Sequence, residues 1–398
     1  MTNITVSGTD RTAPINPLHP SVESFLDDKV KEIYNNYQGK TLTQSMQEAS
    51  RLRPIANSTA NRLRADQVSY DEFNADRQRY IFPREKVAAP FCPVGLVTTH
   101  HVPVTEPAGS IHVHVYRPEG FDEADGKRIP LYVNFHGGGF VLGGLDDDDS
   151  LLRQICKRTP CLVANVAYRL APEFPHPVPA TDSWAALKWL VDHSDELGID
   201  KDFIAVGGLS AGACLAAVLA QMAAVDPTMP RLTLQVLIVP VTDARYVPLV
   251  VPKDDTELST LRAPYDSYYE FAFAPMLPLA RMAWFYRLWL GEDPDTHAKN
   301  AADVRASPIV APDNVLRMVC AASIHVAEID PLASEASAYH HRLLDVGRWS
   351  ELISYKGMVH PFAQWDGALP QSQELLANVV QALKSGFVWG YPICNPEE

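Results

Sequence analysis

One serine stands between two glycines in the stretch Gly208-Leu209-Ser210-Ala211-Gly212. An apolar, strand-like run precedes this pentapeptide, and an alanine- and leucine-rich, helix-like run follows it. Small residues at both glycine positions leave room for a sharp strand-to-helix turn, which would expose the serine oxygen for attack on a carbonyl carbon. The N–H of Ala211 would then lie at a helix start, where it can donate to an oxyanion. The alternative is a plain tight turn.

A serine hydroxyl is a poor nucleophile at neutral pH and needs a base, for which His360 is the candidate. It follows the last predicted strand, in KGMVHPF, while Asp330 ends the strand predicted before it, in AEIDPL. The chain order Ser210, Asp330, His360 is the order found in α/β-hydrolases. Glu328 is the rival acid, but it lies within the strand rather than at its exit. Asp330 is therefore preferred as the carboxylate that orients the base.

Three successive glycines follow another apolar run, in the motif HGGGF at residues 136–140. Their backbone N–H groups are free of side chains and can converge on one oxygen. We expect the N–H groups of Gly138 and Gly139 to join that of Ala211 in an oxyanion hole. The alternative is a merely flexible glycine loop. His136 is expected to hold the turn by hydrogen bonding rather than to take a proton.

The elements that must position these residues follow an α/β rhythm. Apolar strand-like runs alternate with amphipathic helix-like runs, which predicts a mainly parallel sheet with helices on both faces. The predicted strands lie within residues 111–118, 129–136, 161–173, 203–208, 232–243, 319–332 and 350–362, and the clearest helices within 180–193, 211–220 and 372–387.

Two segments break this rhythm and predict a helical cap. The chain before residue 89 is polar and helical in pattern, with candidate helices at 19–37 and 41–54. Residues 244–302 are aromatic, proline-punctuated and too long for a connecting loop. We therefore divide the chain into an N-terminal cap segment, a first part of the core, a cap insertion and a second part of the core, at residues 1–88, 89–243, 244–302 and 303–398.

These motifs together resemble the hormone-sensitive-lipase-like family of α/β-hydrolase carboxylesterases. The resemblance rests on HGGGF, VAYRLAPEFPHPVPATDSWAALKWL, GLSAG, ASPIVAP, AEIDPL and GMVHPF, and covers most of residues 100–385. It implies an α/β-hydrolase fold with a helical cap and a cofactor-independent serine mechanism, with the catalytic and oxyanion residues named above. Two positions depart from the family pattern: Leu209 stands where Asp or Thr is usual, and Pro361 where Gly is common.

Composition narrows the choice of partners. The 398 residues carry a formal net charge of −14 and no basic run, which argues against nucleic acid and against an anionic membrane surface. We find no signal peptide and no membrane-spanning stretch.

The six cysteines form no C-x-x-C pair and no zinc-ligand spacing. We therefore expect a cytoplasmic protein with no metal and no cofactor. The apolar tail at 386–394 predicts docking on the chain's own surface, with a homodimer contact as the alternative.

The sequence thus predicts a serine-dependent hydrolase of a small to medium, fairly apolar carboxylic ester, working through an acyl-enzyme. An amide substrate is not excluded by the residues. The same machinery could also serve biosynthetic acyl transfer, lactone chemistry, product release or cyclisation. Two further hypotheses are a lyase that works without a nucleophilic serine and a non-catalytic hormone-type receptor. The presence of Ser210 argues against the lyase, and that of His360 against the receptor.

Overall fold

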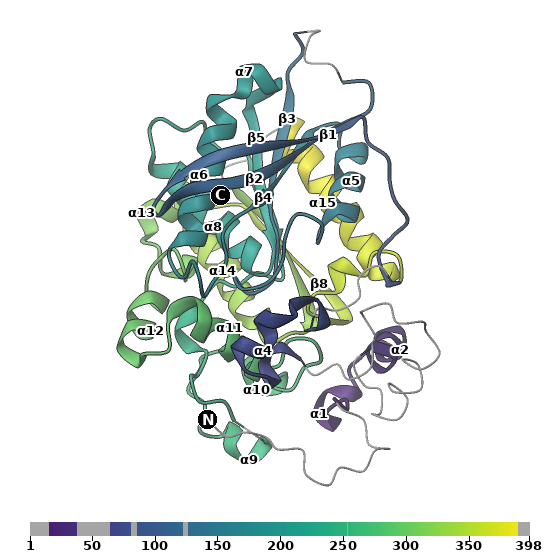
Figure 1. The fold of residues 1–398 in the computed structure, drawn as a ribbon, viewed down its shortest axis with the longest axis vertical. Helices are drawn as coiled ribbons and strands as arrows, with labels where there is room; N and C mark the ends of the chain where they lie inside the picture. The colour runs from purple at the N-terminus through teal and green to yellow at the C-terminus, as the bar shows by residue number, and fades with distance from the viewer. Residues whose placement is uncertain (1–15, 38–63, 81–85, 122–125, 253, 389–398) are drawn as a thin grey trace.

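A central sheet of eight strands organises the computed structural model, which describes residues 16–37, 64–80, 86–121, 126–252 and 254–388 (Figure 1). The strand order across the sheet is β1-β2-β4-β3-β5-β6-β7-β8. The first two strands pair antiparallel with each other, β2 pairs antiparallel with β4, and all later pairings are parallel. The strands are β1 Leu96–Thr105, β2 Ala108–Arg117, β3 Ile129–Phe135, β4 Leu162–Ala167, β5 Ile199–Leu209, β6 Leu234–Ile238, β7 Ala321–Ile329 and β8 Ser350–Val359.

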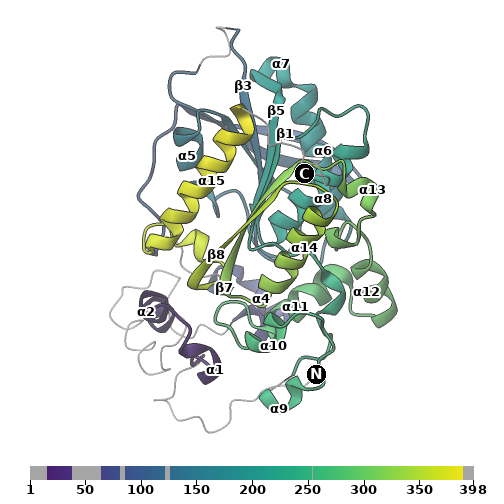
Figure 2. The same ribbon diagram turned by 180° about the vertical axis from the view of Figure 1, so that it is seen from behind.

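Helices cover both faces of this sheet, as Figures 1 and 2 show from opposite sides. Helices α5 and α15 pack on one face, and α6, α8 and α14 on the other. The mainly parallel, doubly covered sheet predicted from the sequence is therefore confirmed. The core helices are α5 Asp149–Arg158, α6 Val178–Asp192, α7 Ser194–Leu197, α8 Ala211–Val225, η6 Pro308–Val310, α13 Asp313–Leu316, α14 Ala333–Asp345, η7 Phe362–Gln364 and α15 Pro370–Val388. Within the described ranges, no helix combines the length and the hydropathy needed to cross a bilayer.

The remaining helices gather at the end of the sheet where the parallel strands terminate (Figures 1 and 2). They come from the start of the chain and from the region 244–302. The first group is α1 Pro20–Glu23, α2 Asp28–Tyr37, η1 Ala65–Gln67, α4 Tyr70–Ala75 and η2 Arg77–Tyr80. The second group is η5 Ala244–Tyr246, α9 Asp255–Leu258, α10 Ser267–Glu270, α11 Leu279–Leu290 and α12 Pro294–Ala301.

Aromatic contacts join these two groups. The ring of Phe73 packs edge-on against Trp284 of α11, with centroids 5.3 Å apart. His19 stacks on Phe273 at 4.3 Å. Contacts of this kind bury apolar area from both segments and add the geometric preference of aromatic pairs. The N-terminal segment and the insertion thus pack against each other over one end of the sheet.

Three elements differ from what the sequence predicts. The expected helix at 19–37 is split into α1 and α2, and between them Asp27 donates its backbone N–H to Gly357 at the end of the sheet. The strand expected at 232–243 is only five residues long, because Val239 takes a φ of 42° and Pro240 has no N–H for the ladder. Strand β1 is absent from the sequence prediction, and the helix expected at 41–54 lies outside the described residues.

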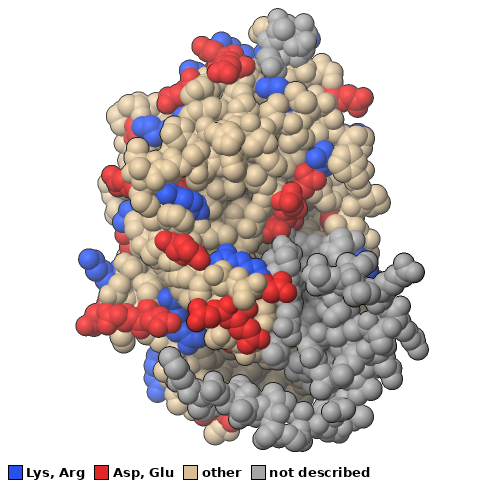
Figure 3. All heavy atoms as spheres, viewed as in Figure 1, with Lys and Arg blue, Asp and Glu red and all other residues tan. Residues whose placement is uncertain are grey.

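Charged side chains of both signs lie on the face of the molecule that Figure 3 shows. On the face shown in Figure 3, Lys and Arg side chains lie scattered among Asp and Glu side chains and form no continuous basic surface. This face offers no electrostatic footprint of the kind that a nucleic-acid backbone requires.

The tightest packing of the core lies where β3, β5 and α8 meet. A Cβ atom added to Gly212 in the first turn of α8 would overlap the carbonyl group of Phe135 at the end of β3. A Cβ on Gly208 would overlap the same carbonyl oxygen. Both neighbours are backbone atoms and cannot rotate away. The glycines thus allow β3 and α8 to approach each other more closely than any larger residue would permit.

We predict that Gly212→Ala lowers the free energy of unfolding by about 3 kcal/mol or more, because the added methyl group overpacks this contact. Gly144→Ala is the matched control, since a Cβ at that position meets nothing within 4 Å. Urea unfolding followed by circular dichroism measures both. Equal stability of the two variants would contradict the close approach.

Candidate active site

Ser210 lies at the turn between β5 and α8, as the sequence predicts. Its backbone has φ 57° and ψ −115°, a conformation that is costly for a residue with a side chain and that is found mainly at functional sites. The serine N–H donates to the carbonyl of Ile238 at 2.8 Å, which anchors the turn to β6. Ala211 follows as the first residue of α8, so no preceding intrahelical carbonyl can accept its N–H.

The glycine loop after β3 lies beside this turn. Gly138 and Gly139 have φ values of 122° and 62°, both in the region that favours glycine. Among the described residues, neither N–H donates a hydrogen bond to another group. A Cβ on Gly139 would overlap the ring of Phe285, which shows that α11 of the insertion lies directly over the loop. The loop therefore presents two unused donors beneath an aromatic lid.

His136 holds this loop in shape. Its Nδ1 is 2.8 Å from the carbonyl oxygen of Gly137, which can only accept, so Nδ1 carries the proton and donates. The imidazole stacks on Tyr168 with ring centroids 4.3 Å apart, and the Tyr168 hydroxyl donates to the His136 carbonyl at 2.7 Å. The structural role predicted for His136 is confirmed.

His360 and Asp330 meet at the same end of the sheet. The Nδ1 atom of His360 lies 2.8 Å from Oδ2 of Asp330, and both side chains are almost fully buried. A carboxylate accepts, so Nδ1 carries the proton and Nε2 is left as the basic nitrogen. The other carboxylate oxygen of Asp330 accepts from the N–H of Leu332 at 2.9 Å, which fixes its orientation. Glu328 instead accepts from the N–H of Gly357 and is not the partner of His360.

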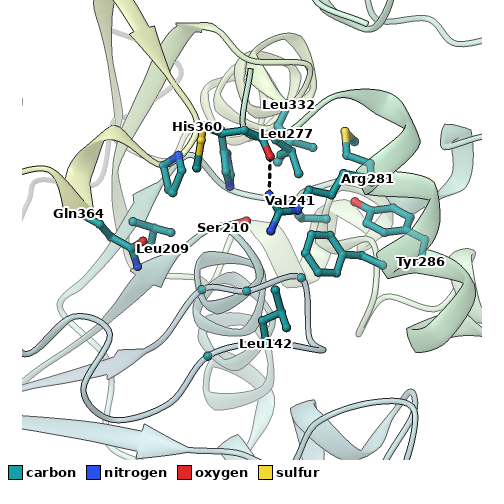
Figure 4. Close-up of a pocket in the computed structure, with 18 residues that line it drawn as sticks. Leu142, Leu209, Ser210, Val241, Leu277, Arg281, Tyr286, Leu332, His360 and Gln364 are labelled. Atoms are coloured by element: carbon teal, nitrogen blue, oxygen red, sulfur yellow. Dashed lines mark hydrogen bonds between the residues drawn. The ribbon is translucent and has the colours of Figure 1, made fainter. Parts of the chain in front are cut away.

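One pocket brings most of the predicted residues together. Ser210, His360, Gly138 and Gly139 all line it, and Figure 4 shows Ser210 and His360 between Gln364 on one side and Arg281 and Tyr286 on the other. The cavity measures about 820 Å³, including the part open to solvent. The other lining residues are Gly137, Leu142, Gly143, Leu209, Val241, Met276, Leu277, Arg281, Met282, Phe285, Tyr286, Leu332, Pro361 and Gln364.

The residues of the pocket wall are not predicted from the sequence. In the structure, helix α11 forms part of this wall. Arg281, Met282, Phe285 and Tyr286 all line the cavity. Their spacing of one, three and four residues places them on one helix face. That spacing is visible in the sequence as RMAWFY, but nothing in the sequence says which face meets the serine.

Both departures from the family pattern lie at the pocket. The Leu209 side chain is buried and faces the glycine loop, since its Cδ2 atom lies 2.6 Å from where a Cβ of Gly137 would stand. It therefore shapes the floor of the cavity next to Ser210. Pro361 lines the same cavity beside His360.

A buried carboxyl group joins the insertion to the core behind the pocket. Glu335 of α14 accepts from the N–H of Thr242, after β6, at 2.7 Å and from the hydroxyl of Tyr268 in α10. Burial raises the pKa of Glu335 to about 8, although these hydrogen bonds oppose the shift. The carboxyl therefore binds a proton more readily in the folded chain than in the unfolded one.

This shift predicts how stability depends on pH. Since the folded pKa of Glu335 lies above the unfolded value, its contribution to stability is complete below about pH 4.5 and is lost as pH rises to about 8. Glu335→Gln has no such proton to lose. The free energy of unfolding of the variant, minus that of the wild type, should therefore increase between these pH values. Denaturant titrations across this range measure the difference, and parallel pH profiles would contradict the prediction.

The pocket is not accompanied by a candidate metal centre. Within the part of the chain that the structure describes, no group of three or more His, Cys, Asp or Glu side chains is arranged to hold a metal ion. The groups that the pocket presents for chemistry are a serine hydroxyl, an imidazole and backbone amides.

Comparison with known proteins agrees with the fold. Residues 132–364 match the family described as alpha/beta hydrolase fold. AB hydrolase superfamily protein C1039.03 of Schizosaccharomyces pombe is 32% identical over 94% of this chain and 98% of its own length. Ethyl acetate hydrolase of Pseudomonas putida is 31% identical over 70% of this chain and 80% of its own.

A solved structure is similar as well. EstE1, a thermophilic carboxylesterase cloned from a metagenomic library, superposes with a TM-score of 0.67 at 31% identity, over 80% of this chain and 98% of its own. The chain therefore belongs to the α/β-hydrolase fold family. The resemblance to the hormone-sensitive-lipase-like esterases is confirmed, and the protein is a carboxylesterase-type hydrolase.

Proposed function

We propose that Ser210, His360 and Asp330 form the catalytic triad of this ester hydrolase. The observation that carries the proposal is the buried hydrogen bond between His360 and Asp330, because it leaves the basic Nε2 of His360 for the pocket that holds Ser210. Asp330 keeps the imidazole in this tautomer and stabilises its protonated form.

The reaction proceeds through an acyl-enzyme. The oxygen of Ser210 bonds to the ester carbonyl carbon while its proton passes to Nε2 of His360. The bond from this carbon to the alcohol oxygen then breaks, and the alcohol leaves with the proton from Nε2. Water attacks the acyl-serine as His360 again takes a proton, the acid leaves, and that proton returns to Ser210.

The N–H groups of Gly138, Gly139 and Ala211 stabilise the oxyanion of both tetrahedral intermediates. Support comes from the two unused donors of the glycine loop and from the place of Ala211 at a helix start. Each such donor contributes about 3–4 kcal/mol to the stability of a transition state of this kind.

The substrate is a small to medium ester with a largely apolar body. Support comes from the lining of the cavity, in which aliphatic side chains of leucine, valine and methionine outnumber the polar and charged side chains. The simplest outcome is that water accepts the acyl group, so that the free acid is released. Acyl transfer to another acceptor would need a second site for that acceptor, and a competing alcohol or thiol in the assay would reveal it as a second product.

The proposed domain division is supported by the aromatic contacts between the N-terminal segment and the insertion. Residues 1–88 and 244–302 form one helical cap, supported by the packing of Phe73 on Trp284, and residues 89–243 and 303–398 form the catalytic core.

We place the protein in the cytoplasm, supported by the free thiols of Cys92, Cys156, Cys161, Cys214 and Cys320. The homodimer stays a prediction, since most of the apolar tail lies outside the described residues.

We predict that Ser210→Ala lowers kcat for p-nitrophenyl esters by at least about 10⁴-fold, because no other group at the site can form the acyl-enzyme. Its fold should be unchanged by circular dichroism. Turnover is measured with acyl chains from acetyl upward, and the preferred length sizes the acyl pocket. Turnover by the alanine variant at the wild-type rate would refute the assignment.

A matched pair of variants tests the acid. Asp330→Asn should lower kcat by about 10⁴-fold, because the amide favours the wrong histidine tautomer. Glu328→Gln changes the rival carboxylate two residues earlier, whose partner is the N–H of Gly357, and should leave kcat within about twofold. The reverse pattern would assign the acid to Glu328.

A further inference from the structure

Arg281 carries a positive charge into the pocket that holds Ser210 and His360. Figure 4 shows its side chain reaching from α11 into the space between Tyr286 and His360. One nitrogen, Nη1, donates to the carbonyl oxygen of Met276 at 3.0 Å, drawn there as the dashed line. The guanidinium is thus held over the reaction centre from the cap side.

Within the part of the chain that the structure describes, this guanidinium has no counter-ion. Among the described residues, no carboxylate lies within ion-pair distance of Arg281, and its buried Nε atom has no hydrogen-bond partner. The carboxylate whose charge acts on it is that of Asp66, and the two oxygens of this carboxylate accept hydrogen bonds from Arg64 at 3.0 and 3.1 Å. A partly buried cation whose described partners are a backbone carbonyl and the ring of Phe285, 5.6 Å from its Cζ atom, costs stability, and an anionic ligand would compensate this cost.

The position of Arg281 is also unfavourable for the helix that carries it. The residue lies in the first turn of α11, at the positive end of the helix dipole, and that turn contains no acidic residue. Burial lowers the pKa of Arg281, and the nearby charge of Arg64 acts in the same direction. The charge of Asp66 acts in the opposite direction and raises this pKa. Local helix stability does not account for the position of Arg281.

Tyr286 adds a second unused donor to the same wall. Its hydroxyl is buried and has no hydrogen-bond partner within the described chain. In Figure 4 its oxygen lies on the side of the ring that faces Arg281. The same helix face thus offers a cation and a neutral donor to one ligand group.

We propose that Arg281 binds a carboxylate carried by the ester substrate, with the hydroxyl of Tyr286 as an additional donor. A planar guanidinium pairs with a carboxylate through parallel hydrogen bonds, and this pairing strengthens when water is excluded. The apolar walls hold the carbon chain between this carboxylate and the ester. Hydrolysis then releases a dicarboxylic acid if the charge lies on the acyl side, or a hydroxy acid if it lies on the alcohol side.

This proposal rests on the proposed function, and two pairs of esters test it. Monoethyl adipate is compared with ethyl hexanoate, which places the carboxylate on the acyl side. 4-Acetoxybutanoate is compared with butyl acetate, which places it on the alcohol side. Hydrolysis is followed by proton release in a pH-stat. We expect the wild type to favour the anionic member of at least one pair in kcat/KM by about tenfold or more.

The variants separate binding from structure. Arg281→Gln should reduce the anionic-to-neutral ratio of kcat/KM by about 30-fold, mostly through KM, and Arg281→Lys should keep part of it. Arg287→Gln is the matched control, since Arg287 lies on the same helix, does not line the pocket and donates to the carbonyl of Leu249. Its ratio should not change. If Arg281→Gln fails to fold, Tyr286→Phe provides the second test and should lower the ratio severalfold.

Two results would overturn the proposal. One is a wild type without preference for either anionic ester, and the other is an equal loss on both members of a pair in Arg281→Gln, as expected if Arg281 only clamps the loop at Met276. In either case, Ser210 would still be required for the hydrolysis of the neutral esters, so the proposed function would stand. Failure of the proposed function looks different, because all four esters would then remain intact or would be cleaved equally by Ser210→Ala.

Discussion

The close approach of the end of β3 to the first turn of α8 is the constraint on which the site depends. Gly208 and Gly212 allow the Phe135 carbonyl to lie against both ends of the turn at Ser210. The glycine loop begins immediately after Phe135, so the same contact carries the loop to the serine. Strand pairing and helix burial elsewhere in the core stabilise this junction, and they offset the backbone strain stored at Ser210.

The second half of the site comes from the cap, whose helix α11 lies on the glycine loop of the core. Phe285 of α11 lies on Gly139, which seals the glycine loop from above and positions the same helix face over the cavity. This face carries Arg281 and Tyr286, two polar side chains that the core does not partner. Glu335 ties the cap to the core behind them. On the roles proposed above, the core supplies the reaction chemistry and α11 of the cap contributes to the choice of substrate.

The chemical groups could be predicted from the sequence because they lie at strand ends. In a parallel sheet, residues that follow successive strands meet at one edge, so the exits of three strands bring Ser210, Asp330 and His360 to one place. The pocket wall could not be predicted in this way. Helix periodicity puts Arg281 and Phe285 on one face, but only tertiary packing decides where that face points. The length of β6 was overestimated for a related reason, because a local backbone turn ended an otherwise apolar run.

The central claim is that Ser210 is the activated nucleophile of the pocket. The most direct measurement is labelling of the native protein with a fluorophosphonate, followed by proteolysis and mass spectrometry of the modified peptide. We predict a single adduct on Ser210, formed at a rate that falls when an ester substrate competes. An adduct on a different serine, or continued ester turnover by protein that does not react, would contradict the account.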